Sequence, residues 1–380
     1  MILYLSNATA YPIYDRLFKA GKIKTGYQMQ KFNDNLIHGL SKSCDVAAVS
    51  PLPYVGVSAE RIDEVHDGIR YIGLKNTVGR LHKIMNIINL ISECKRVIKE
   101  TKPQYILCDA IARSPQIVSL YIGKKYHIPV VGIVTDLPGM LSVENSKPLK
   151  HIKGMQKFDG YILLTEQMNE VVNPLNKPYI VMEGLCAEKL PELREKDKKK
   201  IVLYTGSLWE KDAGIEYFVE GFIKAELENC ELHLYGTGEL DLWLEEIENQ
   251  HHQIKYMGCV TNDEIVRLQC EATLLVNPRP SNEEFCKYSF PSKTIEYMAS
   301  GTPVLMTRLP GVPDKYFDYV YTIEQEDADG VCKVLKEILQ KPSGMLFAKG
   351  IAAREFVSSK KSCLLQSKRL MQFLIEKLAG

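Results

Sequence analysis

The chain has 380 residues, of which 45% are hydrophobic and 25% are charged, and its formal net charge is +1. This length favours two domains, because single hydrophobic cores stop growing at about 250–300 residues. A net charge so close to zero argues against a dedicated nucleic-acid-binding protein, which would carry a basic excess. The ten cysteines include no Cys-x-x-Cys pair, so we expect free thiols in a reducing compartment, without a disulfide framework or a zinc site.

The N-terminal segment Met1–Asn7 has no basic stretch followed by a long apolar run. It therefore predicts a first β-strand and not a signal peptide. No apolar run in the sequence approaches the roughly 20 residues that cross a bilayer. We expect a cytoplasmic protein, and peripheral contact with the inner face of the membrane stays open as an addition.

In the first half of the chain, short apolar runs alternate with stretches of helical periodicity. The predicted strands are Ile2–Leu5, Val46–Val49, Tyr105–Cys108, Val130–Thr135 and Gly160–Leu164. The clearest predicted helices are Lys83–Glu100 and Gln116–Tyr126. This alternation predicts an α/β domain with a doubly wound parallel sheet over residues 1–188.

A charged segment with a proline, residues 190–200, interrupts this pattern and predicts an exposed linker. The alternation then resumes. The predicted strands are Ile201–Tyr204, Glu231–Tyr235, Ile254–Met257, Thr273–Asn277 and Pro303–Met306, with helices at Gly214–Ala225 and Asp263–Cys270. We therefore predict a second Rossmann-like domain over residues 189–344 and a helical tail over residues 345–380. Ligands of open α/β sheets lie beyond the carboxyl ends of the strands, so a cleft between the domains is the expected site.

The most informative motif is the segment from Ser289 to Val304, which predicts a loop, a short helix and the start of a strand. Pro291 and Ser292 suit a helix N-terminus, and Gly301 suits the position just after its end. Lys293 and Glu296 are three residues apart and therefore share one helix face. A lysine at a helix N-terminus favours an anion, and a carboxylate one turn later can accept hydrogen bonds from hydroxyls. The pair predicts a site for a phosphorylated sugar, although an internal ion pair between them is the structural alternative.

Three glycine turns in the second half follow predicted strands. The first, Tyr204–Ile215, contains Gly206, which allows a backbone amide to approach a phosphate, and Lys211, which can add charge. The second contains Gly236, and the third is the segment Met257–Val260. Tight turns of purely structural use would explain each of them.

Two charged residues follow predicted strands at their carboxyl ends. Arg279 lies between two prolines that stiffen the exit of its strand, and arginine binds phosphate bidentately. An ion pair with Glu283 or Glu284 is the alternative. Asp136 ends an apolar strand of the first domain, where it either faces a ligand or forms an Asx-turn.

Two further patterns have simpler explanations. Asp327-Ala328-Asp329 has the spacing of a metal-binding Asp-x-Asp, but we predict an acidic pair at a helix N-terminus. The stretch Arg80–Lys102 alternates Lys83, Lys95, Arg96 and Lys99 with apolar residues. It predicts either an ordinary surface helix or a helix that rests on anionic lipid.

The segment Ser289–Val304 resembles the motif region of retaining glycosyltransferases with the GT-B fold, and in particular family 4 (group 1) enzymes that build bacterial surface polysaccharides. The family's Glu-x7-Glu motif ends at Glu296, whereas Tyr288 stands where its first glutamate is expected. The resemblance implies two Rossmann-like domains, with a C-terminal helix that crosses back to the first. It also implies a hexosyltransferase that uses a nucleotide-sugar, with a UDP-sugar expected, no metal cofactor, and a glycan or lipid-linked acceptor.

The resemblance also implies roles for single residues. Glu296 would bind the ribose, and Asp136, Lys211 and Arg279 would act in catalysis. The remaining donor-binding candidates are Gly26, Gly206, Ser207, Gly236, Val260, Tyr288, Ser289, Phe290 and Lys293. Whether Tyr288, Glu283 or Glu284 replaces the missing glutamate stays open. A non-catalytic sugar-nucleotide-binding subunit and a GT-B epimerase are the alternative functions.

Overall fold

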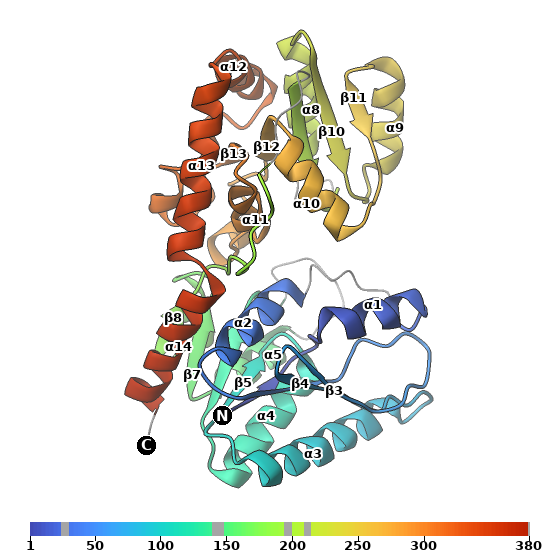
Figure 1. The fold of residues 1–380 in the computed structure, drawn as a ribbon, viewed down its shortest axis with the longest axis vertical. Helices are drawn as coiled ribbons and strands as arrows, with labels where there is room; N and C mark the ends of the chain where they lie inside the picture. The colour runs from blue at the N-terminus through green and yellow to red at the C-terminus, as the bar shows by residue number, and fades with distance from the viewer. Residues whose placement is uncertain (24–29, 139–147, 194–199, 209–213, 379–380) are drawn as a thin grey trace. The chain divides into compact units, whose positions relative to one another are not determined.

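The computed structural model describes residues 1–23, 30–138, 148–193, 200–208 and 214–378. The chain forms two compact units, drawn in Figure 1. Unit 1 comprises Met1–Glu188 and Ser362–Gly380, and unit 2 comprises Lys189–Lys361.

Unit 1 is built on a sheet with the strand order β3-β4-β2-β1-β5-β6-β7-β8. All neighbouring strands are parallel except the β3–β4 hairpin. The central strands are apolar and buried along their whole length, as expected of parallel strands with helices on both faces. The strands are β1 (Ile2–Leu5), β2 (Val46–Ser50), β3 (Ile62–His66), β4 (Ile69–Gly73), β5 (Tyr105–Asp109), β6 (Val130–Val134), β7 (Gly160–Leu163) and β8 (Tyr179–Val181).

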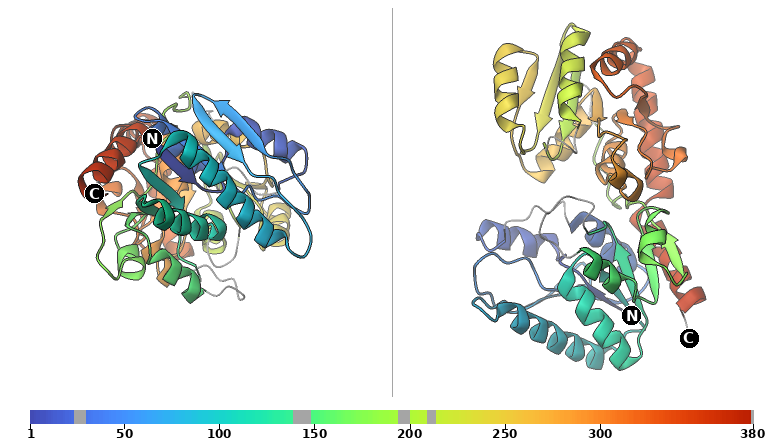
Figure 2. Two further views of the ribbon diagram at one scale, coloured as in Figure 1. Left: turned by 90° about the horizontal axis from the view of Figure 1, so that it is seen from below. Right: turned by 180° about the vertical axis from the view of Figure 1, so that it is seen from behind.

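The helices of unit 1 are α1 (Tyr11–Lys19), α2 (Lys31–Ser41), α3 (His82–Thr101), α4 (Arg113–Tyr126), α5 (Pro148–Met155), α6 (Met168–Val172) and α14 (Cys363–Leu378). Helices α3 and α4 lie side by side, as the view from below in Figure 2 shows. The C-terminal helix α14 packs on α2 and adds Leu370 and Leu374 to the core of unit 1. Gly39 allows this close approach, because a Cβ there would lie 2.3 Å from Ser367 Oγ.

Unit 2 has a six-stranded, fully parallel sheet with the order β11-β10-β9-β12-β13-β14. This is the 3-2-1-4-5-6 order of dinucleotide-binding Rossmann folds, whose direction of winding reverses between the first and fourth strands. Here that switch point lies between β9 and β12. The strands are β9 (Lys200–Thr205), β10 (Cys230–Tyr235), β11 (Ile254–Tyr256), β12 (Leu274–Asn277), β13 (Val304–Thr307) and β14 (Tyr321–Ile323).

The helices of unit 2 are α8 (Ile215–Ala225), α9 (Asp241–Gln250), α10 (Asn262–Glu271), α11 (Lys293–Ser300), α12 (Ala328–Leu339) and α13 (Ser343–Lys360), with 3-10 turns η2 (Glu284–Tyr288) and η3 (Asp314–Tyr316). Helix α12 begins at the predicted acidic pair. The carboxylate of Asp327 accepts a hydrogen bond from the Gly330 amide at 2.9 Å, so it caps the helix N-terminus.

The predicted tail, residues 345–380, divides between the two units. Helix α13 packs on α11 in unit 2, and only α14 belongs to unit 1. A Cβ on Gly350 would lie 2.1 Å from the carbonyl oxygen of Gly301, so the glycine allows α13 to touch the end of α11. Arg354 adds a hydrogen bond of 2.9 Å to the carbonyl of Ala299 in the last turn of α11. These contacts assign the first half of the tail to unit 2.

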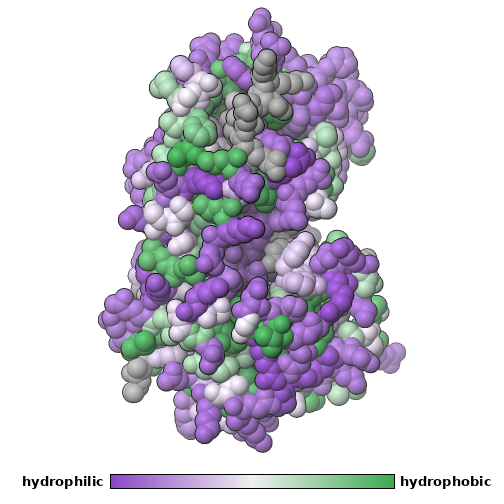
Figure 3. Space-filling model, in the orientation of Figure 1, coloured by the Kyte–Doolittle hydropathy of each residue, from purple (hydrophilic) through white to green (hydrophobic). Residues whose placement is uncertain are grey.

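On the face drawn in Figure 3, hydrophilic residues predominate and hydrophobic ones are scattered among them, as is usual for a surface in contact with water. Among the helices that the structure describes, none combines the length and the apolar character that crossing a membrane requires.

Candidate functional site

Gly206, Arg279 and two residues of the Ser289–Val304 motif lie at the switch point of the unit 2 sheet. Gly206 directly follows β9, Arg279 follows β12 by two residues, and α11 carries Lys293 and Glu296. Helix α11 runs from Lys293 to Ser300 and ends at Gly301, which has the left-handed φ of 78°. Both boundaries agree with the sequence prediction. The carboxyl end of a parallel sheet at its switch point is where Rossmann-like folds bind ligands.

Lys293 extends from α11 to the end of β9. Its Nζ lies 3.1 Å from the hydroxyl of Tyr204 and 4.2 Å from the centre of that ring. Among the described residues it forms no salt bridge, so the alternative of a Lys293–Glu296 ion pair within 4 Å is not what the structure shows. Its position depends on Gly206, because a Cβ at that glycine would lie 2.4 Å from Nζ. The ammonium group therefore lies directly against the backbone of Gly206, where any side chain would displace it.

The charge of Lys293 is destabilised where it lies. Burial and the nearby Arg279 lower the pKa of Lys293, Glu296 offsets part of this decrease, and the resulting pKa is about 7. A buried cation beside a second cation is stabilised by an anionic ligand. The electrostatics of the switch point therefore favour binding of a negatively charged group.

Arg279 supplies the second cation. Its Nη1 donates a hydrogen bond of 3.3 Å to Ser289 Oγ, and its guanidinium lies 5.5 Å from the ring centre of Phe285. The hydroxyl of Thr307 on β13 donates to the Arg279 carbonyl and fixes the backbone. Glu283 and Glu284 are exposed, and no salt bridge joins either of them to Arg279 within the described residues. The guanidinium thus keeps donors for a ligand.

Glu296 is positioned by a residue that the sequence analysis did not identify. Gln269 on α10 donates from Nε2 to Glu296 Oε1 at 2.9 Å and to Thr205 Oγ1 at 3.3 Å. The Tyr297 hydroxyl is bonded to the Thr205 amide at 2.9 Å, so α11 is tied to β9 at two positions. Gln269 is buried on the amphipathic helix α10, and a buried polar side chain needs hydrogen-bond partners. A glutamine among the apolar positions of that helix was the signal available in the sequence.

The predicted glycine turns stack against one another at the carboxyl ends of β9, β10 and β11. The Gly206 amide donates to Tyr235 at 2.9 Å, and the Gly236 amide donates to Gly258 at 2.8 Å. Gly206 and Gly236 have φ values of 151° and 142°, which favour glycine. A Cβ on Gly236 would lie 1.7 Å from the Gly206 carbonyl oxygen. Backbone therefore packs on backbone here, with no room for a side chain.

The remaining donor-binding candidates of unit 2 differ in the exposure of their side chains. Phe290 is buried, with its ring centre 5.2 Å from that of Tyr316, so packing accounts for it. Tyr288, at the end of η2, is partly buried, as is Val260, whereas Ser207 is exposed. Lys211 and Gly26 lie outside the described residues. The roles of all these residues stay predictions.

In unit 1 the candidate Asp136 follows β6 and is partly buried. Its Oδ1 accepts a hydrogen bond of 2.7 Å from the amide of the next residue, Leu137, whereas an Asx-turn uses the amide two residues on. A second carboxylate, Asp109, ends the neighbouring strand β5 and was not identified from the sequence. It accepts hydrogen bonds from the Ile111 amide at 3.1 Å and from Asn33 Nδ2 at 3.4 Å.

Asp109 gives a prediction for pH-dependent stability. Burial raises its pKa, the amides of Ile111 and Ala112 and the side chain of Asn33 offset part of this increase, and the resulting pKa is about 6. The folded state therefore binds the proton more tightly than the unfolded chain does, and stability falls as the pH rises from about 4 to about 6. We expect Asp109→Asn to raise the free energy of unfolding of unit 1 by about 1–3 kcal/mol at pH 7.5 and by about half as much at pH 5.

Urea denaturation at the two pH values measures this difference, with the exposed Asp45→Asn as the control. Equal destabilisation by Asp109→Asn at both pH values would contradict the prediction, because it would show that the ionised carboxylate stabilises the fold.

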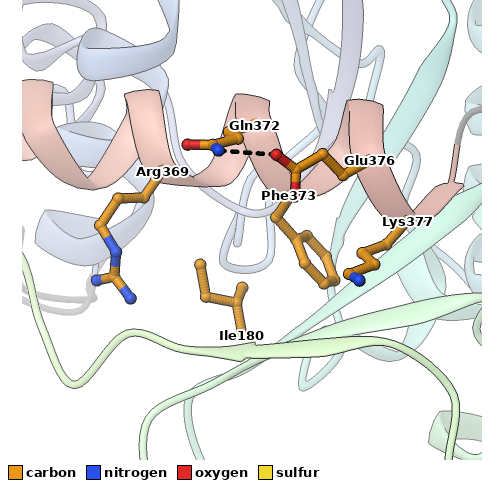
Figure 4. A pocket seen from close by; sticks show the side chains of 6 residues that line it. All are labelled: Ile180, Arg369, Gln372, Phe373, Glu376 and Lys377. Carbon is orange, nitrogen blue, oxygen red and sulfur yellow. Dashed lines mark hydrogen bonds between the residues drawn. The ribbon is translucent and has the colours of Figure 1, made fainter.

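A hollow on unit 1 lies apart from these residues, between α14 and β8 (Figure 4). Ile180 and Phe373 form its apolar part, and Gln372 donates a hydrogen bond of 2.7 Å to Glu376 along the helix. The hollow contains none of the candidate residues, and no group of three or more His, Cys, Asp or Glu side chains in the described part of the chain could hold a metal ion.

Solved structures show the same fold over the whole chain. Sucrose-phosphate synthase from Thermosynechococcus elongatus has a TM-score of 0.69 at 15% identity, with 98% of each chain covered. HepE from Anabaena, solved in complex with UDP and glucose, has a TM-score of 0.65 at 12% identity, with 99% of each chain covered. The apo form of the lipopolysaccharide outer core galactosyltransferase WaaB has a TM-score of 0.60 at 16% identity, with 99% of each chain covered. The predicted fold class, GT-B, is thereby confirmed.

The family described as "Glycosyl transferases group 1" matches residues 199–341. These residues form most of unit 2, including the switch point with Lys293 and Glu296. The chain therefore carries a group 1 glycosyltransferase domain and is a glycosyltransferase with the GT-B fold. No curated protein matches the sequence.

Proposed function

We propose that this glycosyltransferase uses a nucleotide-sugar donor, preferentially a UDP-sugar, and that unit 2 binds it. The observation that carries the proposal is the convergence of Lys293, Arg279 and Glu296 on the switch point of the unit 2 sheet. The cations would bind the diphosphate, and Glu296, held by Gln269, would accept hydrogen bonds from the ribose hydroxyls. Support comes from the HepE structure, which has the same fold and contains UDP and glucose.

The proposed reaction proceeds with retention of the anomeric configuration. The bond between the sugar C1 and the β-phosphate oxygen breaks, and the acceptor oxygen bonds to C1 on the same face. The acceptor proton passes to the departing phosphate oxygen. Stabilising the charge on that leaving group is the main catalytic requirement, and Lys293, Arg279 and the amide of Gly206 are the candidates for it. This assignment requires no metal cofactor.

We further propose that unit 1 receives the acceptor, with Asp136 orienting its hydroxyl group. The acceptor is proposed to be a glycan or a lipid-linked glycan of a surface polysaccharide pathway. An enzyme with a lipid-linked acceptor would work in the cytoplasm at the inner face of the membrane, as a peripheral protein.

Titration with UDP-glucose and an assay of donor hydrolysis test the donor assignment. We expect Glu296→Ala to weaken UDP-glucose binding by about tenfold or more, because a charged acceptor of two hydroxyl groups is lost. The matched control is Glu245→Ala on α9, which changes an exposed carboxylate of the same unit. Absence of nucleotide binding to the wild-type protein would overturn the proposal, and equal binding by Glu296→Ala would remove Glu296 from it.

A further inference from the structure

The N-terminal half of α3 and the segment before it expose an unusual number of apolar side chains. Exposed fractions are 53% for Val78, 66% for Leu81, 58% for Ile84, 42% for Met85 and 50% for Ile88. The last four are spaced as i, i+3, i+4 and i+7 and therefore lie on one helix face. We call these five residues the α3 apolar surface; α3 lies at the lower edge of unit 1 in Figure 1.

The polar residues of this region face the protein and hold the apolar ones outward. Asn86 Oδ1 accepts hydrogen bonds from the amide and hydroxyl of Thr77, at 3.2 and 3.1 Å, and its Nδ2 donates to Asn76 Oδ1 at 2.8 Å. Asn89 Nδ2 donates to the Lys75 carbonyl at 3.1 Å. The segment before α3 is thus pinned to the helix. The exposure of its apolar residues is a fixed feature of unit 1, and exposed apolar patches mark surfaces that bind something.

The charged residues of the segment that carries this surface have a single sign. From Leu74 to Ser92 the sequence contains no Asp or Glu, while Lys75, Arg80 and Lys83 are exposed. None of these three cations forms a salt bridge with a described residue. Exposed apolar side chains beside unpaired cations match the surface of an anionic bilayer, where apolar groups enter the headgroup region and cations lie against anionic lipids.

The C-terminal half of α3 differs. Glu93 accepts from Arg61 at 2.8 Å, and Arg96 donates to Glu100 at 2.6 Å, so the one arginine of this half is paired within the protein. The basic stretch predicted from the sequence, Arg80–Lys102, therefore contains two parts. The first has no acidic residue, whereas in the second Glu93 and Glu100 accompany the basic residues. Lysine is also depleted in protein–protein interfaces, and the α3 apolar surface has no aromatic residue, so a lipid surface fits better than a protein partner.

We propose that the α3 apolar surface, with Lys75, Arg80 and Lys83, docks unit 1 on anionic phospholipid membranes. This inference rests on the proposed peripheral association and names the surface that produces it. Its occupant is the bilayer itself, and docking is independent of whether a donor is bound.

Flotation with vesicles of phosphatidylcholine alone, or with 30% phosphatidylglycerol added, tests the proposal. We expect the wild-type protein to float with the anionic vesicles and to be released by 0.5 M salt, since exposed charges are screened. Ile84→Gln with Ile88→Gln, and separately Arg80→Glu with Lys83→Glu, should each lower the bound fraction about tenfold. Glutamine maintains helix propensity, so the first pair tests the apolar contribution without disturbing α3.

The matched controls are Leu242→Gln, at an exposed leucine of α9, and Lys333→Glu with Lys336→Glu on α12. These should leave flotation unchanged. A wild-type protein that does not float, or α3 variants that float like the wild type, would overturn the proposal. So would a dimer, detected by light scattering, that Ile84→Gln with Ile88→Gln dissociates, because the surface would then bind a second copy. UDP-glucose binding by the same variants reports separately on the donor site, so failure of docking and failure of the proposed function are distinguishable.

Discussion

Replacing Lys293 by methionine is expected to lower kcat/KM for a UDP-sugar by about 10²–10³-fold, the usual effect of removing one donor to a developing negative charge. Methionine preserves the length and apolar stem of the side chain, so the change mainly removes the ammonium group that lies against Gly206 and Tyr204. Steady-state kinetics with a soluble acceptor, or donor hydrolysis, measures the effect. Lys333→Met, an exposed lysine of α12, is the control.

The same residue predicts a pH dependence of donor binding. Burial and Arg279 lower the pKa of Lys293 to about 7 in the free protein, so at pH 8 most molecules must take up a proton when the diphosphate binds. UDP-glucose affinity should therefore fall by up to about tenfold for each pH unit above 7, with uptake approaching one proton at pH 8. Calorimetry in buffers of different ionisation enthalpy measures that uptake. Unchanged proton uptake in Lys293→Met would assign the titration to another group.

Replacing Gly236 by alanine is expected to destabilise unit 2 by about 2–4 kcal/mol and to weaken nucleotide binding by more than tenfold. The added Cβ would overlap the Gly206 carbonyl oxygen, at 1.7 Å, and the glycine has a φ of 142°. Because the obstacle is backbone and not a flexible side chain, the turn after β9 must shift, and Gly206 and Lys293 shift with it. Thermal unfolding and UDP-glucose titration measure the two effects.

Gly68→Ala separates the collision from the backbone strain. Gly68 has a left-handed φ of 77°, but a Cβ there meets no atom within 4 Å. We expect it to cost about 1 kcal/mol and to leave donor binding unchanged. An equal loss of binding in both variants would show that the packing between Gly206 and Gly236 does not shape the site.

The sequence by itself predicted the two parallel sheets, because buried parallel strands are short apolar runs separated by amphipathic helices. Strand β1 was predicted with its observed ends, Ile2–Leu5, and helix α11 was bounded by Ser292 and Gly301 as its capping residues indicated. The hairpin β3–β4 was missed, since only one strand of it is buried and its polar residues show no apolar run.

The sequence also predicted several residues of the site. Lys293 and Glu296 are neighbours on one helix face, and the glycine turns follow strands. What it could not provide is the set of contacts between segments far apart in the chain. Gln269 meets Glu296 across 27 residues, and Asp109 meets Asn33 across 76. Such hydrogen bonds depend on strand order and helix packing, which local patterns leave undetermined.

Tertiary structure likewise decided how charge and exposure are distributed. Lys293 is an ordinary lysine in the sequence, and only its burial beside Arg279 lowers its pKa to about 7. The stretch Arg80–Lys102 has one basic pattern in the sequence, but in the fold Asp63 of β3 pairs with Arg96 of its second half. Arg80 and Lys83 of its first half form no salt bridge with a described residue. Local sequence thus determined the elements and their caps, whereas the packing of distant elements determined which charges remain available to a ligand or a membrane.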